Sequence, residues 1–241
     1  NLLMSGHSKW STIKRQKGVA DAKRSQVFTK LSNAITAAAR QGADPDMNFK
    51  LRLAIDRARN ANMPKDNIDR AVKRGGGQED GVRLEEIIYE GYGPGGVAFL
   101  IETLTDNRNR TTANLRHILD KHGGRLADSG SVAWLFETKS LLTASKPTNN
   151  LDSLELQLIE AGAEEIEEDS GELLITAPAK QLEELKKVCQ KNNLTISYSS
   201  VEPVANNQID IADQTEITKL DNLREALNND DDVTNTYDNA G

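Results

Sequence analysis

The residues most able to do chemistry in this chain are cations gathered near its N-terminus. Between Ser8 and Lys30, seven Lys or Arg side chains stand against a single acid, Asp21. The seven are Lys9, Lys14, Arg15, Lys17, Lys23, Arg24 and Lys30. Cations at this density gain free energy from counterion release when they meet phosphates. A surface that only kept the protein soluble would mix the two signs, so this run predicts a segment that binds a polyanion.

Two aromatic side chains accompany these cations. The indole of Trp10 can stack on an unpaired base, a contact worth about 1–3 kcal/mol. Its alternative role is a hydrophobic anchor that fixes the N-terminal arm to a helical bundle, and both alternatives stay open. His7 has no second ligand at a metal-binding spacing. We therefore expect a solvated side chain or a phosphate contact there, and no metal.

A second candidate surface is the run TDNRNRT at residues 105–111. Asp106 or Asn107 can cap the helix that follows, and the free N–H groups of a helix N-terminus bind anions. Arg108 and Arg110 would lie beside that terminus. The run predicts either a phosphate site or a strand-to-helix turn whose arginines pair with acidic neighbours.

The sequence gives no catalytic residue, metal site or cofactor site. His7, His117, His122 and the sole cysteine, Cys189, form no metal-ligand pattern. Gly75–Gly77 lacks the Gly-Lys-Ser/Thr ending of a phosphate loop, and the GYGPGG run from Gly91 to Gly96 is typical of a hairpin. We expect a protein that is not an enzyme, with a buried, inert thiol at Cys189.

The net charge of −7 conceals a strong asymmetry along the chain. Up to Gly77 there are 16 Lys and Arg against 6 Asp and Glu, a balance of +10. The remainder holds the other 14 basic and 31 acidic residues, a balance of −17. Segregated charge influences the choice of partner rather than the fold. The basic part suits nucleic acid, and the acidic part would repel it.

The elements that position these residues follow from the spacing of apolar side chains. Helical periodicity predicts helices from Asp21 to Gly42, from about Met47 to Asn60, and from Pro64 to Gly75, where Gly75 suits a left-handed C′ position. The run GGGQEDG then predicts a linker. The expected basic helical domain therefore spans residues 1–77.

The periodicity beyond the linker predicts two α/β domains. Strands are expected at 84–92, 96–104 and 132–136, with a helix at 107–122 between the last two. A second series places strands at 138–144, 164–168, 172–177 and 195–202, with helices at 151–161 and 179–192. The C-terminal tail adds a helix at 214–228 and a strand at 233–237.

The tail supplies the helix and strand that 84–136 lacks for a complete split βαβ layer. We therefore expect an α+β protein of three domains, in which two ferredoxin-like, split βαβ domains follow the helical one. Residues 82–136 and 205–241 form one discontinuous domain, and the βαββαβ domain 137–204 is inserted in it.

Six runs of sequence in the same order resemble the YebC family of bacterial proteins. They are GHSKW at 6–10, ADPDMN at 43–48, NMPKDNIDRAVKRGGG at 62–77, YEGYGPGGVA at 89–98, TDNRNRT at 105–111 and GSVAWLF at 130–136. The acidic stretch Asp230–Asp232 departs from the family pattern, and we expect it to touch no motif. The resemblance implies three domains and a role in transcription regulation through DNA binding. Mitochondrial relatives of the family act as translational activators.

These observations predict a nucleic-acid-binding regulator of gene expression. The first alternative is a translation factor whose basic domain binds ribosomal RNA on the ribosome, and the second is a protein-binding adaptor. We expect a cytoplasmic monomer, since a lone cysteine suits a reducing compartment and no run of about 18 apolar residues could span a membrane. The sequence does not separate DNA from RNA as the partner.

Overall fold

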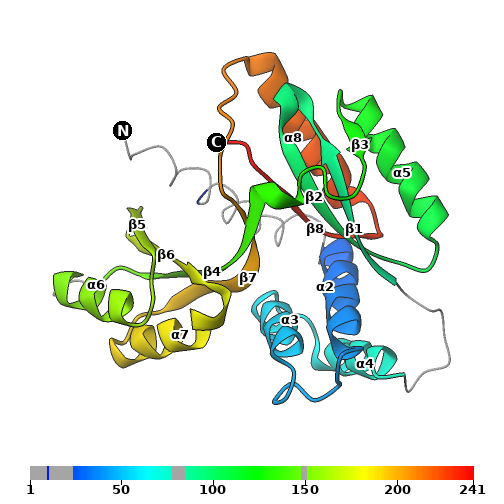
Figure 1. Ribbon diagram of the computed structural model, residues 1–241. Helices are drawn as coiled ribbons and strands as arrows, with labels where there is room; N and C mark the ends of the chain where they lie inside the picture. Colours follow the sequence, from blue (N-terminus) through cyan, green and yellow to red (C-terminus); the bar gives the residue numbers. More distant parts are fainter. Residues whose placement is uncertain (1–9, 11–23, 78–84, 148–150) are drawn as a thin grey trace. The chain divides into compact units, whose positions relative to one another are not determined.

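The computed structural model describes residues 10, 24–77, 85–147 and 151–241, and it divides into two compact units (Figure 1). One unit is built on Phe136–Gln208. The other unit combines the described part of Arg15–Leu135 with Ile209–Ala240. Mixed helices and antiparallel sheets confirm the α+β class. In the described part of the chain, no helix is long and apolar enough to cross a membrane.

Three helices form the bundle in the second unit. They are α2 (Arg24–Ala39), α3 (Phe49–Asn60) and α4 (Lys65–Gly75), as their periodicity predicts. Their shared core is aliphatic and contains Ile35, Leu51, Ile55, Met63 and Ile68. The Asn48 side chain caps α3 by accepting from the Leu51 N–H, and its amide donates to the carbonyls of Ala38 and Gly42. One side chain thus fixes the connection between α2 and α3.

Gly75 has a different role from the one expected. It is the last residue of α4 rather than a left-handed residue, and the residue with positive φ (73°) is Gly77. A Cβ atom on Gly75 would lie 2.3 Å from the carbonyl oxygen of Thr36 in α2. The residue must therefore be glycine because two helix backbones approach closely there.

The same unit contains a four-stranded antiparallel sheet of order β3-β1-β2-β8. In chain order its elements are β1 (Glu85–Tyr92), η1 (Pro94–Gly96), β2 (Ala98–Thr105), α5 (Arg108–Lys121), β3 (Arg125–Ala127), η2 (Ala133–Leu135), α8 (Gln214–Asn229) and β8 (Val233–Asp238). Helices α5 and α8 contribute Leu115, Leu119, Leu220, Leu223 and Leu227 to the core beneath the sheet. Strand β8 pairs with β2, so the C-terminal tail, from Val233, completes a sheet that begins at Glu85.

The prediction of a strand at 132–136 is wrong for most of its length. Residues 133–135 form the short 3-10 helix η2, and Phe136 is the first residue of the next strand. The backbone N–H groups of Gly130, Val132 and Ala133 donate to the carboxylate of Glu90, so they are not available to a neighbouring strand. Strand β3, a three-residue strand, was not predicted.

The first unit is a βαββαβ fold with the strand order β5-β6-β4-β7. Its elements are β4 (Phe136–Ser145), α6 (Leu151–Glu160), β5 (Glu165–Asp169), β6 (Glu172–Pro178), η3 (Ala179–Gln181), α7 (Leu182–Lys191) and β7 (Ile196–Ala205). The central position of β4 beside β6 is that of a split βαβ, ferredoxin-like domain, as predicted. Each element lies within a few residues of its expected range.

Candidate nucleic-acid interface

Most of the predicted N-terminal binding residues lie outside the described part of the chain. These are His7, Lys9, Lys14, Arg15, Lys17 and Lys23. Arg24 is the first residue of α2, but its side chain is also outside the description. The assignment of these seven residues to nucleic-acid binding stays a prediction, and the described geometry bears only on Trp10, Lys30, Arg108 and Arg110.

Trp10 is buried, with 4% of its surface exposed. It packs with Leu141 and Leu174, and partly with Tyr198 and Val204, in the core cluster of the first unit. The hydrophobic anchor expected on the helical bundle therefore lies on the inserted α/β domain instead. An indole in this position is not available to stack on a base, so a stacking role would require it to leave this core.

Lys30 is half-buried in α2 rather than displayed on an open cationic surface. Burial lowers the pKa of its ammonium group to about 8, and the nearby carboxylates of Asp230 and Asp231 only partly oppose this shift. A lysine in this environment faces acids of its own chain, in the turn between α8 and β8. It is therefore a weak candidate for a phosphate contact.

The bundle nevertheless displays other cations. Arg40, Lys65, Arg70 and Lys73 are exposed. Among the residues that the structure describes, none of these four side chains forms an ion pair or a hydrogen bond. Arg74 differs, because its guanidinium donates to Thr36 Oγ1 at 2.9 Å and so links α4 to α2. These four exposed cations are candidates for phosphate contacts, in addition to the residues that the sequence predicted.

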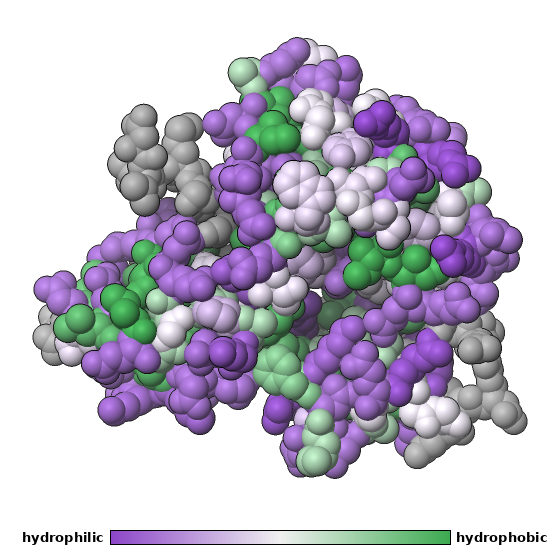
Figure 2. Space-filling model, viewed as in Figure 1, coloured by the Kyte–Doolittle hydropathy of each residue, from purple (hydrophilic) through white to green (hydrophobic). Residues whose placement is uncertain are grey.

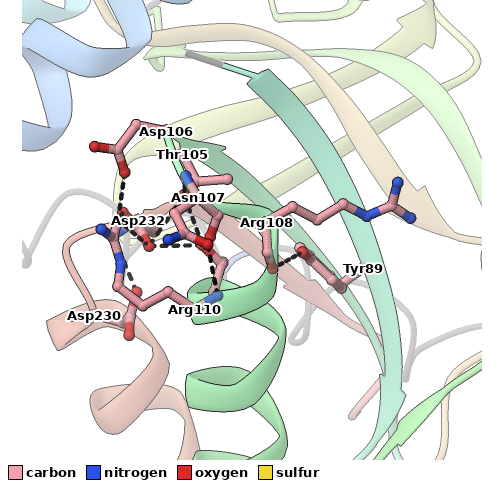
Figure 3. A network of polar contacts seen from close by, with 9 residues as sticks. Tyr89, Thr105, Asp106, Asn107, Arg108, Arg110, Asp230 and Asp232 are labelled. Carbon is pink, nitrogen blue, oxygen red and sulfur yellow. Dashed lines mark hydrogen bonds and ion pairs between the residues drawn. The ribbon is translucent and has the colours of Figure 1, made fainter. Parts of the chain in front are cut away.

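Three contacts at the start of α5 explain the run TDNRNRT (Figure 3). Asn107 is the N-cap, and its side chain accepts from the N–H of Arg110 at 3.1 Å. The Thr105 hydroxyl accepts from the N–H of Asn107 at 2.9 Å, and its oxygen lies 2.7 Å from the hydroxyl oxygen of Thr111. The threonines at both ends of the run thus hold the turn together, and the capping role expected of Asp106 or Asn107 belongs to Asn107.

Asp232 occupies the anion position beside this helix terminus. Its carboxylate accepts from the Thr111 hydroxyl at 2.7 Å and from the guanidinium of Arg110 at 3.0 Å. Arg110 also pairs with Asp106 at 2.9 Å. The hydrogen bonds that Arg110 donates to Asp232 and Asp106 raise its pKa above the ordinary value. The chain therefore supplies its own anion, which is the second of the two alternatives that the sequence left open.

This outcome corrects the expectation that Asp230–Asp232 touches no motif. The backbone N–H of Asp232 also donates to the Asp230 carboxylate, and the Asp232 carbonyl accepts from the N–H of Leu104. No signal in the sequence joins residues 121 positions apart (Thr111 and Asp232). The contact follows from the pairing of β8 with β2, which brings the end of the chain to the start of α5.

Arg108 lies next to Arg110 in sequence but outside this network. Its backbone carbonyl accepts from the hydroxyl of Tyr89, while its side chain extends away from the acids (Figure 3). In the described residues no carboxylate pairs with it. Arg108 thus remains an exposed cation on the α/β domain, and its phosphate role stays a prediction.

Glu90 is a buried acid that sequence reasoning missed. Its carboxylate accepts from the N–H groups of Gly130 and Val132 at 2.6 Å and of Ala133 at 2.9 Å. Burial would raise its pKa, but these N–H donors outweigh that effect and hold the pKa below its ordinary value. The contact joins two of the runs noted in the sequence, YEGYGPGGVA and GSVAWLF. Glu90 in the first run and Gly130 in the second are 40 residues apart along the chain.

The described residues offer little for covalent or metal chemistry. Burial raises the pKa of the Cys189 thiol to about 11, which agrees with the inert thiol that was expected. In the part of the chain with described positions, no three His, Cys, Asp or Glu side chains are grouped so as to hold a metal ion.

Comparison with known proteins gives matches over nearly the whole chain. Residues 8–78 match the family model described as the TACO1/YebC protein N-terminal domain, and residues 84–240 match the one described as the TACO1/YebC second and third domain. A "probable transcriptional regulatory protein" of Persephonella marina is 46% identical over 238 residues, which cover 98% of this chain and 95% of the relative. A protein of the same description from Desulfotalea psychrophila is 46% identical over 237 residues, with the same coverage.

A solved structure has the same fold. The crystal structure of a conserved hypothetical protein from Aquifex aeolicus superposes with a TM-score of 0.81 at 38% sequence identity. The superposition covers 92% of each chain. The fold is therefore shared with a protein whose structure has been determined experimentally.

Proposed function

Because this chain belongs to the TACO1/YebC family, we propose that it is a non-enzymatic regulator of gene expression that binds nucleic acid through its N-terminal helical domain. The names of its relatives, "probable transcriptional regulatory protein", support a role in regulation. The observation that carries the binding step is the set of exposed cations Arg40, Lys65, Arg70 and Lys73 on the bundle, which pair with no residue in the described part of the chain. These cations belong to the segment up to Gly77, whose charge balance is +10.

The binding mode that fits these residues is contact with the phosphate backbone. Lysine and arginine neutralise phosphates without reading sequence, whereas specificity requires side chains at base edges in a groove. In α4 the exposed cations alternate with Asp66 and Asp69, which is unfavourable for insertion of the whole helix into a groove lined by phosphates. Sequence-independent binding is therefore favoured, and it suits duplex DNA and folded RNA alike.

The experiment that tests this function measures binding as a function of salt. Fluorescence anisotropy with a labelled DNA duplex and a labelled RNA hairpin gives the slope of log K against log salt, about −0.9 for each phosphate contacted on duplex DNA. Replacing Lys9, Lys14, Arg15 and Lys17 together by Ala should flatten that slope. An unchanged slope in this variant would contradict the proposal.

The second candidate is a translation factor on the ribosome, which the family's mitochondrial relatives suggest. The network at the start of α5 favours this translation role. Asp232 already binds Thr111 and Arg110 there, at a helix terminus that could have given a second DNA contact. Sedimentation of a cell lysate through a sucrose gradient, followed by crosslinking, separates the two. Recovery with ribosomes and crosslinks to ribosomal RNA support translation, and recovery in light fractions with crosslinks to chromosomal DNA alone contradict it.

A further inference from the structure

The sheet β3-β1-β2-β8 has a second face opposite its helices. Along β1 the side chains alternate, and Ile87 and Tyr89 pack into the core with α5 and α8. Ile88, Glu90 and Tyr92 therefore point to the other face. Ile88 is 61% exposed, and in Figure 2 the surface over this sheet is pale, of near-neutral hydropathy, with purple polar side chains at its border. On the same face Leu100 and Tyr237, which follow Glu90 across the register, are buried, so this face is exposed only in part, around Ile88.

Two aromatic rings meet on this face at one backbone carbonyl. The indole Nε1–H of Trp134 donates to the carbonyl of Ser131 at 3.1 Å, and the hydroxyl of Tyr92 donates to the same oxygen at 3.3 Å. Trp134 is 70% exposed, although tryptophan is a residue that proteins usually bury. Arg125 lies opposite Tyr92 in the strand register, with its guanidinium 5.0 Å from the centroid of the ring.

The turn that carries Trp134 is held in place by buried charge. Glu90 binds the N–H groups of Gly130, Val132 and Ala133, on both sides of Ser131. These bonds fix the backbone from which the indole projects, so the ring is preorganised. Because Glu90 is saturated with donors, it adds no free carboxylate to the surface.

Two other acids on this face of the sheet are also engaged, and the first, Glu86, pairs with Lys50 at 3.0 Å. Glu102 accepts from the side-chain amide of Asn235 at 2.7 Å. Asp128, in the turn after β3, and Glu137, three residues after Trp134, are the exposed acids near the rings in sequence, and Glu137 pairs with Lys139 at 3.0 Å. The surface that results offers π faces and one arginine.

We propose that Tyr92, Arg125 and Trp134 form a platform on which unpaired bases of a single-stranded nucleic acid stack. The inference rests on the proposed function and adds to it a second contact, on the α/β domain. Aromatic rings hold bases of any sequence by stacking, and arginine adds a cation–π or phosphate contact. The exposed tryptophan, the fixed turn and the cation beside the tyrosine are the three features that such a platform requires.

The two tryptophans of the chain allow a direct test, since Trp10 is buried and Trp134 is exposed. In a Trp10→Phe variant, Trp134 is the sole source of tryptophan fluorescence. Twelve-nucleotide RNA and DNA oligomers should quench this emission as they bind, and the comparison of the two shows whether ribose is preferred. In the matched Trp134→Phe variant, the emission of Trp10 should not respond. If acrylamide cannot reach Trp134 in the Trp10→Phe protein, the face is covered and the proposal is wrong.

Affinities complete the test. Trp134→Ala and Tyr92→Leu should each weaken binding of the single-stranded oligomers by about five-fold or more, from the free energy of one stacked base. The same variants should bind a DNA duplex as the wild type does. Ile88→Ala is the control, because it truncates an exposed side chain on the same face without removing a ring.

The outcomes separate this inference from the proposed function. If the wild type binds neither duplex nor single strand, the proposed function fails. If the wild type binds but Trp134→Ala and Tyr92→Leu leave single-strand affinity unchanged, only the platform is wrong. Equal losses for duplex and single strand would also overturn the platform, since they would show an effect on the fold rather than on stacking.

Discussion

Four exposed cations of the helical bundle and the lysines of the α/β domains have different neighbours, although two other bundle cations, Lys50 and Arg59, do lie beside acids. On the α/β domains, most lysines lie beside an acid, as in the pairs Lys139–Glu164 (2.8 Å), Lys146–Glu168 (2.7 Å) and Lys187–Glu184 (2.6 Å). On the bundle, Arg40 and the exposed cations of α4 form no ion pair with any described residue. The numbers of charged residues in the two regions explain only part of this difference, because the fold determines which charged side chains lie next to one another.

Arg110 shows what the comparison teaches. In sequence it belongs to a basic run and resembles a phosphate ligand, yet in the fold it is held between Asp106 and Asp232. An arginine whose charge is already matched gains little from a phosphate, because the existing pair must be broken. The density of cations predicts a binding surface only where the fold does not bring acids to it.

The largest expected effect concerns the most deeply paired cation of the α/β domains. Arg224 binds Asp238 at 2.7 Å, and the two side chains are 15% and 5% exposed. Arg224→Leu leaves the Asp238 carboxylate buried without its partner, which should lower the free energy of unfolding by about 3–5 kcal/mol. Urea denaturation measures this loss. Lys146→Gln, at an exposed pair, should leave the midpoint where it is in the wild type.

The next effect concerns the unpaired cations of the bundle. Replacing Arg40, Lys65, Arg70 and Lys73 together by Gln should reduce the salt slope of duplex binding by about 0.9 for each phosphate contact that is lost. Affinity at low salt should fall by about a hundred-fold if all four contacts exist. The matched control replaces four paired lysines of the inserted domain by Gln: Lys139, Lys146, Lys186 and Lys187.

The two quadruple variants test the comparison itself, because each removes four positive charges. If pairing decides availability, only the bundle variant loses affinity. Equal losses in both variants would mean that net charge alone governs binding, and the distinction between paired and unpaired cations would have no functional meaning.

Much of the fold was predictable because local signals agree with it. Gly, Pro and Asn mark the ends of the helices, and the change from helical to alternating periodicity falls at the linker before β1. The failure at residues 132–136 has a non-local cause. The strand expected at 132–136 is a turn because Glu90, 40 residues earlier, binds its N–H groups, and a side chain acting at that distance leaves no periodic trace.

The candidate site was predictable only as a set of residue types. The capping role at Asn107 follows from local sequence. In contrast, Asp232, which pairs with Arg110, lies immediately before β8 and beyond the inserted domain. Trp10 was recognised as an anchor or a stacking residue, but its burial among Leu141 and Leu174 depends on a domain that begins 126 residues later, at Phe136. Exposure and pairing are properties of the tertiary fold, and local sequence does not reveal them.

A smaller effect is expected when a paired cation is released. In Asp232→Ala the Thr111 hydroxyl loses its charged acceptor, and the free energy of unfolding should fall by about 1–2 kcal/mol. The α5 terminus and Arg110 then lack their anion. Sulfate should restore the thermal midpoint of this variant by more than it raises that of the wild type. A variant that responds to sulfate as the wild type does would show that Asp232 does not occupy an anion site.

The smallest effect concerns Lys30, the bundle cation that faces acids. Its pKa is about 8 in the folded protein against an ordinary value of 10.5, because burial disfavours the charged form more than Asp230 and Asp231 favour it. Between these two pH values the unfolded chain binds more protons than the folded chain, so this group makes the free energy of unfolding rise with pH. Below pH 8 its charge opposes folding.

Lys30→Met removes this dependence on pH. The free energy of unfolding of the wild type should therefore rise by about 1–2 kcal/mol relative to that of the variant from pH 8 to pH 10.5. Urea denaturation of both proteins across this range measures the difference. A constant difference between the two proteins would mean that Lys30 titrates as an exposed lysine, and it would then belong with the available cations of the bundle.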